Sequence, residues 1–313
     1  MSQLTTDAAP TNRAFLFIKP NAATPAMEKL VEATLAAKGI KILQKGVIDG
    51  PTIDAKRLID QHYYAIASKA TLLKPSELPV PEDKFEAFFG VSFQDAIAQG
   101  TAVNALDACK KLDCTPDELR AEWRAVCKSG DMIKFGGGFY CGKIKGLQIF
   151  NPFFMAMRAV YTSSTAKLIY FDVEFDQQQL SWAAFRGEVL GPTDPVKAPS
   201  GSLRRLALER WEDLGLPFAP DTTENAVHAS ASPFEGLAER MNWLEAEPKS
   251  DSFGGALIEA GVPLSTLRAW ANDPRVALGG GAEGSVFDAF EDLDATECLA
   301  KAVEIERVDA FGE

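Results

Sequence analysis

The sequence predicts an α/β fold in which helices pack against an antiparallel sheet. Residues 13–19 form an apolar run that favours a buried strand, and residues 40–49 alternate as a second strand does. Between them, residues 24–38 place apolar side chains at helical spacing, and Gly39 follows as a helix stop. Residues 51–67 favour a further helix, with proline tolerated in its first turn. A strand, a helix, a strand and another helix open a split β-α-β arrangement, so we predict a ferredoxin-like α/β sandwich.

The same kind of pattern resumes after residue 150. We expect, in order, a helix at 152–161, a strand at 167–173, a helix at 176–189, an irregular loop at 195–203, a helix at 204–214, a strand at 225–228 and a helix ending at Leu244. We therefore assign residues 13–69 and 151–244 to one domain, preceded by a disordered leader at 1–12.

Residues 70–150 interrupt this pattern and form a predicted insertion that begins with a stiff, proline-rich linker. Helices are expected at 85–99, 102–111 and 115–128, and short strands at 132–135, 139–144 and 147–150. The glycines at 136–138 lack the residues of a P-loop and the spacing of a Rossmann loop, so they favour a hairpin turn. Several aromatic residues indicate that the insertion has a small core of its own: Phe88, Phe89, Phe93, Trp123 and Phe139.

Residues 245–313 form a predicted acidic, helical C-terminal extension. Helices are expected at 253–260, 264–271, 286–290 and 297–308, with a flexible break at the three glycines 279–281. The first two helices have the spacing of a helix-turn-helix, but their acidic setting disfavours DNA binding. We expect them to pack against the rest of the chain or a partner, and a protein partner would bind through the insertion or this extension.

Composition limits the classes of function. The chain has 313 residues, of which 46% are hydrophobic and 24% charged, as is ordinary for a globular protein. Its formal net charge of −12 argues against binding nucleic acid or an anionic membrane. No apolar run of about eighteen residues predicts a membrane span, and no secretory signal is recognised in the first twelve residues. The five cysteines form no CxxC pair, which favours free thiols in a reducing compartment, and we expect a cytoplasmic location.

The most informative stretch for function runs from residue 225 to residue 239. A short buried strand ends on His228, and a helix begins soon afterwards, with Ser232 suited to its N-cap and Glu235 three residues later. The positive end of that helix favours an anion beside the imidazole, and Glu239 can fold back to hold the ring. A histidine that transfers phosphate needs an orienting partner and nearby cations. The alternative is a buried histidine that is hydrogen-bonded for structural reasons only.

Six short motifs follow one another along the chain. They are Ala-Phe-Leu-Phe-Ile-Lys-Pro at 14–20, Asp-Gln-His-Tyr at 60–63, Pro-Phe-Phe at 152–154, Leu-Gly-Pro-Thr-Asp-Pro at 190–195, Pro-Ser-Gly-Ser-Leu-Arg at 199–204 and Asn-Ala-Val-His-Ala-Ser at 225–230. Together, in this order and with the spacing from Pro195 to Arg204 kept, they resemble nucleoside diphosphate kinase. The resemblance covers residues 13–69 and 151–244, and it implies the same ferredoxin-like layout.

The resemblance implies a role for each matching residue. His228 would be phosphorylated and then pass its phosphate to a diphosphate, with Glu239 bonded to the other ring nitrogen. Lys19 and Tyr63 would lie near the transferred phosphate. The implied nucleotide-binding residues are Phe153 stacked on the base, Thr193 and Arg204 at the phosphates, Asn225 at the ribose, Ser230 beside the histidine, and Arg186 in place of a family arginine. Taken alone, Phe153 also fits a core position, Asn225 a turn and Arg204 a solvated charge, but the whole set in order favours the functional interpretation.

Departures from the family pattern bear on the phosphate site. The family arginine lies four positions before the glycine that matches Gly191, whereas this chain has Gly187 there and Arg186 one residue earlier. One residue turns a helical side chain by about 100°, so we predict that this cation is displaced unless a local bulge restores it. The other departures are Ala229 and Ala231 in the histidine motif, Asn21 and Ala22 after the lysine strand, and a longer stretch between Arg204 and His228. We therefore expect weakened nucleotide affinity.

These observations predict transfer of the γ-phosphate from a nucleoside triphosphate to a nucleoside diphosphate through a phosphohistidine at His228. Mg²⁺ would arrive with the nucleotide, since no carboxylate cluster in the sequence indicates a dedicated metal site. The alternative is a catalytically weak or inactive nucleotide-binding or scaffold protein that uses the same fold. The family generally forms hexamers or tetramers, but the insertion and the extension predict a smaller assembly here, a dimer or a monomer.

Overall fold

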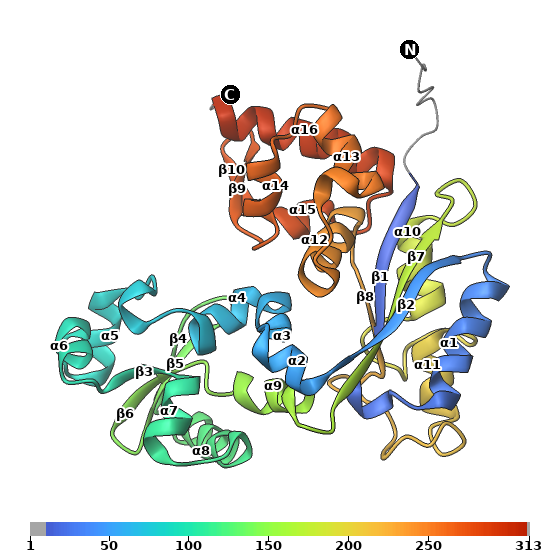
Figure 1. Cartoon of the computed structure of the whole chain (residues 1–313). Helices are drawn as coiled ribbons and strands as arrows, with labels where there is room; N and C mark the ends of the chain where they lie inside the picture. The colour runs from blue at the N-terminus through green and yellow to red at the C-terminus, as the bar shows by residue number, and fades with distance from the viewer. Residues whose placement is uncertain (1–10, 312–313) are drawn as a thin grey trace. The chain divides into compact units, whose positions relative to one another are not determined.

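A computed structural model of the chain describes residues 11–311, which divide into two compact units of mixed α/β structure (Figure 1). The first unit comprises the chain up to Asp49 together with Thr165–Glu313, and the second comprises Gly50–Ser164. The first ten residues of the predicted leader lie outside the described residues, and Asn12 already belongs to a strand. Within residues 11–311, no helix has both the length and the apolar character needed to cross a bilayer. All five cysteines have free thiols, as the sequence predicted.

The first unit is built on a four-stranded antiparallel sheet with the strand order β2-β7-β1-β8. Its strands are β1 (Asn12–Ile18), β2 (Lys41–Asp49), β7 (Lys167–Phe175) and β8 (Val227–Ala229), and a separate hairpin consists of β9 (Arg275–Gly279) and β10 (Ala282–Ser285). Its α-helices are α1 (Pro25–Ala37), α10 (Trp182–Ala184), α11 (Leu203–Glu209), α12 (Pro233–Leu244), α13 (Ser252–Glu259), α14 (Leu264–Trp270), α15 (Val286–Phe290) and α16 (Ala295–Phe311).

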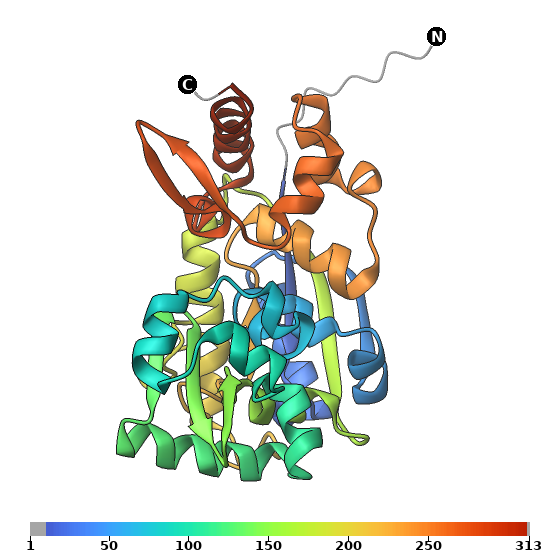
Figure 2. The same cartoon turned by 90° about the vertical axis from the view of Figure 1, so that its left-hand side faces the viewer.

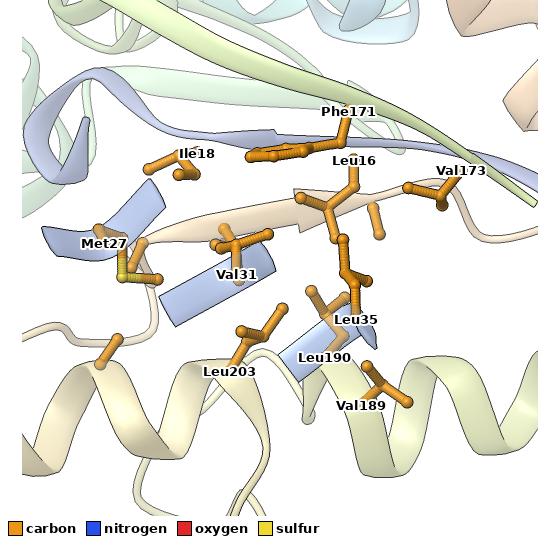
Figure 3. Packing of buried hydrophobic residues seen from close by; sticks show 14 of the residues in the cluster. Leu16, Ile18, Met27, Val31, Leu35, Phe171, Val173, Val189, Leu190 and Leu203 are labelled. Carbon is orange, nitrogen blue, oxygen red and sulfur yellow. The ribbon is translucent and has the colours of Figure 1, made fainter. Parts of the chain in front are cut away.

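The central strand β1 is buried on both faces because every side chain from Ala14 to Ile18 is apolar. Successive side chains of a strand point to opposite faces. Leu16 and Ile18 therefore pack with Met27, Val31 and Leu35 of α1, in the apolar layer shown in Figure 3. Phe15 and Phe17 point to the other face, where both rings contact Trp243 of α12. This alternation places α12, the helix that follows β8, directly against β1.

The C-terminal extension completes this unit around α12. Phe234 and Leu237 of α12 are fully buried in an apolar cluster with residues of the extension, among them Phe253, Trp270 and Phe290. The hairpin β9–β10 packs on α16, as both views show (Figures 1 and 2). The extension therefore belongs to the same compact unit as the sheet, and the expectation that it packs against the rest of the chain is met.

The second unit contains a mixed sheet with the order β3-β6-β5-β4, in which only the β3–β6 pair is parallel. Its strands are β3 (Ala102–Asn104), β4 (Met132–Gly136), β5 (Phe139–Ile144) and β6 (Leu147–Phe150). Its α-helices are α2 (Gly50–Ala55), α3 (Leu58–His62), α4 (Tyr64–Ala67), α5 (Glu82–Phe89), α6 (Phe93–Ala98), α7 (Ala105–Leu112), α8 (Pro116–Ser129) and α9 (Phe154–Thr162). The predicted hairpin at glycines 136–138 is present between β4 and β5.

This second unit extends beyond the predicted insertion 70–150 at both ends. An ion-pair network around the buried Arg158 explains the wider limits, because this residue of α9 contacts the buried Asp60 of α3 at 2.9 Å and the exposed Asp54 of α2 at 2.6 Å. Helices assigned from the sequence to the sheet domain are thereby held inside this unit. It also has cores of its own, one around Phe85 and another around Phe154.

Two long helices predicted before residue 100 are interrupted in the structure. The helix predicted at 51–67 is divided into α2, α3 and α4. Arg57 separates α2 from α3 with a left-handed φ of 58°, and Tyr63 separates α3 from α4 with φ of −103° and ψ of 41°. The helix predicted at 85–99 is divided into α5 and α6, because Gly90 ends α5 with φ of 70°. Glycine adopts such angles without a steric cost, whereas arginine does so rarely.

Three other predicted helices begin or end elsewhere for local reasons. The helix predicted at 102–111 starts at Ala105, because Asn104 caps it and residues 102–104 pair with β6 instead. The helix predicted at 176–189 starts at Trp182, where the hydroxyl of Ser181 accepts from the N–H of Ala184. The helix predicted at 204–214 ends at Glu209.

The flexible break predicted at glycines 279–281 is a hairpin turn between β9 and β10. All three glycines have positive φ angles, of 91°, 62° and 79°. Such angles suit a tight reversal of the chain.

Candidate active site

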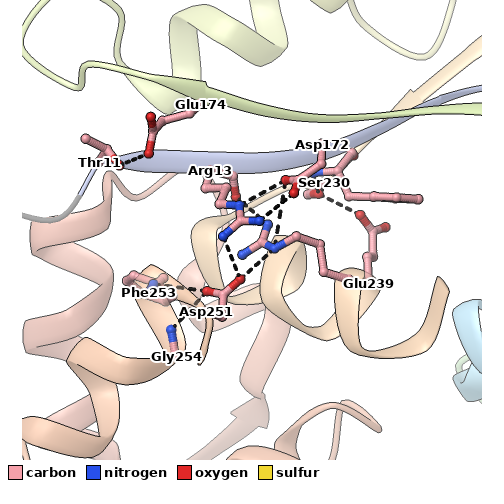
Figure 4. Close-up of polar contacts among 11 residues, drawn as sticks. Thr11, Arg13, Asp172, Glu174, Ser230, Glu239, Asp251, Phe253 and Gly254 are labelled. Atoms are coloured by element: carbon pink, nitrogen blue, oxygen red, sulfur yellow. Dashed lines mark hydrogen bonds and ion pairs between the residues drawn. The ribbon is translucent and has the colours of Figure 1, made fainter. Parts of the chain in front are cut away.

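A histidine, a glutamate and a serine form a hydrogen-bonded chain in the first unit. His228 lies in the middle of β8, paired with Phe17 of β1, and its Nε2 is 2.5 Å from Oε1 of Glu239 on α12. Ser230 donates its hydroxyl to Oε2 of the same carboxylate at 2.6 Å (Figure 4). Because an ionised carboxylate only accepts, the proton of a neutral ring is assigned to Nε2 and the lone pair to Nδ1. The contact between His228 and Glu239 that the sequence predicted is present.

The helix that carries Glu239 begins as its sequence predicts. The hydroxyl of Ser232 accepts from the N–H of Glu235 at 3.0 Å, and Pro233 occupies the first helical position. Oε2 of the Glu235 carboxyl group accepts in turn from the N–H of Ala231 at 2.9 Å. These bonds fix the turn between β8 and α12, so that Glu239 comes back beside the histidine about two helical turns later.

The surroundings of His228 keep its imidazole neutral. The side chain is 17% exposed, and the ring stacks on Phe17 with a centroid distance of 4.6 Å. Burial, followed by the positive charges of Lys19, Arg204 and Arg186, lowers the pKa of His228 well below its ordinary value of 6.5. Both effects disfavour the imidazolium ion. At neutral pH the ring therefore keeps a nucleophilic nitrogen.

A cavity of about 520 Å³ opens beside His228. Its wall combines residues from four segments of the first unit: Arg186, Gly191 and Thr193, then Arg204, then His228, Ala231 and Glu235, and finally Glu291 and Asp292. Arg186, Thr193, Arg204 and His228, which lie far apart in the sequence, thus share one cavity. The two arginines are the groups of this wall that can bind an anion, and Arg186 is also paired with the acidic residues Glu291 and Asp292.

Arg204 joins two segments of this wall. Its Nη1 donates to the carbonyl of Gly191 at 2.8 Å, and its Nη2 donates to the carbonyl of Val227, next to the histidine, at 3.1 Å. Gly191 has φ of 88°, and a Cβ at this position would lie 2.8 Å from Oγ of Ser202. Glycine is therefore required where the loop closes on α11, and Thr193 follows as an exposed residue.

Arg186 lies in a π-helical turn. Helix α10 continues as a π-helix from Phe185 to Leu190, and the N–H of Gly191 donates to the carbonyl of Arg186, five residues back, at 3.0 Å. A π turn holds one more residue than an α turn. A local bulge is thus present at this arginine, and Arg186 lines the cavity.

Lys19 and Asn225 lie beside this wall. Nζ of Lys19 donates to the carbonyl of Thr223 at 3.2 Å, and Nδ2 of Asn225 donates to the carbonyl of Thr193 at 3.2 Å. Burial lowers the pKa of Lys19 to about 8, although Glu224 acts in the opposite direction. Within residues 11–311, Oδ1 of Asn225 is buried and has no hydrogen-bond partner. A buried acceptor without a donor is costly, so this oxygen is a candidate contact for a hydroxyl group of a ligand.

Tyr63 and Phe153 belong to the second unit. The Phe153 ring packs on Trp123 with a centroid distance of 6.1 Å and against Tyr140 at 5.7 Å, as part of that unit's own core. The ring of Tyr63 contacts His62 edge-on at 4.6 Å. The other predicted site residues are all in the first unit: Lys19, Arg186, Thr193, Arg204, Asn225, His228, Ser230 and Glu239.

Three acidic residues of the cavity wall were not predicted from the sequence: Glu235, Glu291 and Asp292. Glu235 was recognised only as part of the helix cap, although its position in the first turn of α12 already places it near the histidine. Glu291 and Asp292 are two acidic residues in an acidic extension, and no local pattern links them to a cavity formed by distant segments.

Comparisons with known proteins give similarities to solved structures only. No protein-family model matches the chain, and no curated protein matches it. Among the similar solved structures is an NDP kinase from Pyrobaculum aerophilum, with 18% sequence identity and a TM-score of 0.34. The matched region covers 75% of this chain and 96% of the NDP kinase chain. Because this similarity is weak, the site is interpreted from its own geometry.

Proposed function

We propose that the chain is a nucleoside diphosphate kinase-like phosphotransferase, which moves a γ-phosphate from a nucleoside triphosphate to a nucleoside diphosphate through His228. The observation that carries the proposal is the neutral imidazole oriented by Glu239 at 2.5 Å, beside a cavity with two arginines on its wall. The antiparallel order β2-β7-β1-β8, with α1 and α12 on opposite faces, supports a ferredoxin-like sandwich for the first unit.

In the proposed first step, the lone pair on Nδ1 of His228 attacks the γ-phosphorus of the triphosphate. The bond from this phosphorus to the β–γ bridging oxygen breaks, and the diphosphate leaves with that electron pair. The proton on Nε2 stays hydrogen-bonded to Glu239, which stabilises the positive charge that the ring gains. In the second step, a terminal oxygen of another diphosphate attacks the phosphorus, the N–P bond breaks and the ring returns to its neutral form.

The transferred phosphoryl group spreads negative charge over its equatorial oxygens, and catalysis depends on cations fixed around it. We assign this role to Arg186 and Arg204, with Lys19 nearby and the hydroxyl of Thr193 as a further donor. Asn225 would accept a ribose hydroxyl. Mg²⁺ would enter as part of the nucleotide substrate.

Tyr63 and Phe153 keep the roles that the family resemblance implies, at the phosphate and at the base.

The test is labelling of the protein by γ-³²P-labelled ATP. We expect an acid-labile phosphoenzyme, ping-pong kinetics, and complete loss of both label and exchange in His228→Ala with an unchanged circular dichroism spectrum. His62 and His228 are the only histidines, so label that survives in His228→Ala would place the phosphate elsewhere and overturn the proposal. Nucleotide binding without any label would favour the non-catalytic alternative.

A further inference from the structure

The C-terminal extension reaches the wall of the His228 cavity through the turn that follows α15. Nη1 of Arg186 donates to Glu291 at 2.8 Å and to Asp292 at 2.6 Å. We propose that Glu291 and Asp292 are positioning residues, which hold the guanidinium of Arg186 where it binds phosphate. This inference rests on the proposed function, because it takes Arg186 as a phosphate ligand.

The two contacts leave the binding edge of the guanidinium available. Nη1 carries two hydrogens, which suffice for one bond to each carboxylate. Within residues 11–311, no hydrogen bond from Nε or Nη2 of Arg186 accompanies these two. Nε and Nη2 together present the pair of parallel N–H groups that binds an oxyanion through two oxygens. The carboxylates therefore contact the guanidinium through Nη1 and do not use its bidentate edge.

The acidic turn is itself anchored to the site. The N–H of Asp292 donates to the carbonyl of Ala231, three residues after the histidine, at 3.0 Å. Oδ1 of Asp294 accepts from the N–H of Trp182 at 2.7 Å and from Nδ2 of Asn12 at 2.7 Å. Trp182 is the first residue of α10, which continues into the π turn of Arg186. The acidic turn is therefore bonded both to the segment that follows His228 and to the start of the helix that carries Arg186.

An arginine in this position needs such support. Its side chain is 28% exposed, and a long side chain at the rim of a cavity has many rotamers. Burial alone would lower the pKa of Arg186, but the hydrogen bonds to Asp292 and Glu291 raise it. Two fixed acceptors therefore reduce the number of accessible rotamers of a guanidinium that is charged at any working pH, which favours the capture of phosphate.

The opposite role for these carboxylates would be that of an internal competitor, which occupies the arginine in place of phosphate. The two roles predict opposite effects of removing the charges. Loss of a positioning group weakens phosphate binding, whereas loss of a competitor tightens it. The geometry favours positioning, since the carboxylates contact Nη1 alone.

The experiment compares the double variant E291Q/D292N with the control E247Q. Glu247 is also in the extension and also pairs with an arginine, Arg268 at 3.2 Å, but it does not line the cavity. We expect KM for the diphosphate to rise on the order of ten-fold in the double variant, with kcat changed less and E247Q equal to the parent. In an R186A background, which itself raises KM roughly ten- to hundred-fold, the double variant should add nothing.

A second measurement tests the positioning without any nucleotide. The Nε–H signal of Arg186 in ¹⁵N spectra, assigned through R186K, should be sharp in the parent and exchange-broadened in E291Q/D292N. An unchanged signal, a lower KM in the double variant, or an equal loss in the R186A background would each overturn the inference. If the parent gives no phosphoenzyme, the proposed function fails, and the Nε–H signal still decides whether the carboxylates hold the arginine.

Discussion

Ser230 donates its hydroxyl to Oε2 of Glu239 at 2.6 Å, so both oxygens of this buried carboxylate are bonded, the other one to His228. The same hydroxyl oxygen accepts from the N–H of Phe15 at 2.9 Å. Phe15 belongs to β1, an inner strand of the sheet. The orientation of the histidine is therefore fixed through the carboxylate to the most buried strand of the unit.

The first prediction concerns Ser230→Ala. Loss of the hydroxyl removes its buried hydrogen bonds to Oε2 of Glu239 and to the N–H of Phe15, so we expect a loss of about 1–3 kcal/mol in the free energy of unfolding. Phosphoenzyme formation should slow, because Glu239 holds the ring less firmly. Urea unfolding and rapid-quench labelling measure the two effects. The control Ser76→Ala, at an exposed serine of the second unit, should match the parent; a parental labelling rate in Ser230→Ala would contradict the role of this bond.

The second prediction concerns the pH dependence of stability. Burial, followed by the charge of Glu239, raises the pKa of Glu235 from 4.5 to about 8. Between these two values the folded protein binds more protons than the unfolded chain, so this residue makes the free energy of unfolding fall as the pH rises. Glu235→Gln keeps the neutral form at every pH. We expect its Tm to exceed that of the parent at pH 8 and the difference to shrink towards pH 5.

The control for this experiment is Glu283→Gln, which removes an exposed carboxyl group of the β9–β10 hairpin. Its Tm should follow that of the parent across the same range. Parallel Tm curves for the parent and Glu235→Gln would show that the proton is not retained in the folded state.

The elements around His228 could be predicted because their signals are local. Ser232 and Pro233 lie within a few residues of the helix that they start, and the apolar spacing of α1 is contained in the helix itself. The prediction of one continuous helix at 51–67 was wrong for the opposite reason, because the break depends on a contact with a distant residue. Arg57 is held left-handed in a fold where its Nη1 donates to the carbonyl of Thr71. Nothing in the residues beside an arginine specifies such a tertiary contact.

In the candidate site, too, residues in local motifs could be predicted, whereas residues brought in by tertiary contacts could not. Arg204 and His228 belong to motifs that the sequence displays, and the structure places both on one cavity. Glu291 and Asp292 contact Arg186 across 105 and 106 positions of the chain, so only the packing of the extension brings them there. Phe153 illustrates the remaining difficulty, because an aromatic residue at a helix start fits a base platform and a core position equally well.

The third prediction concerns the link between the extension and β1. Oδ2 of Asp251 accepts from Nε of the fully buried Arg240 at 2.8 Å and lies 3.2 Å from Nη1 of Arg13 (Figure 4). Asp251→Asn removes the nearer of two carboxylates that pair with the buried Arg240, the other being Asp172 at 4.0 Å, so we expect a loss of about 3–5 kcal/mol in the free energy of unfolding. Urea denaturation measures this loss. The exposed pair of Glu247 and Arg268 supplies the control, since Glu247→Gln should cost at most about 1 kcal/mol.

A small effect of Asp251→Asn would mean that the extension is held to the sheet by its apolar cluster alone. The buried ion pairs would then serve the geometry of the unit and add little to its stability.

The last prediction concerns assembly. Strand β2 is at the end of the sheet order β2-β7-β1-β8, and its side chains Leu43 and Val47 are 38% and 60% exposed. An edge strand with exposed apolar residues can pair with a second copy of the chain. The second unit and the extension add mass that a closed assembly must place away from its interfaces, so we expect nothing larger than a dimer. Light scattering at micromolar concentration should give 33.9 kDa or twice that mass. Val47→Lys should shift any dimer to monomer, and a mass of six chains would refute the prediction.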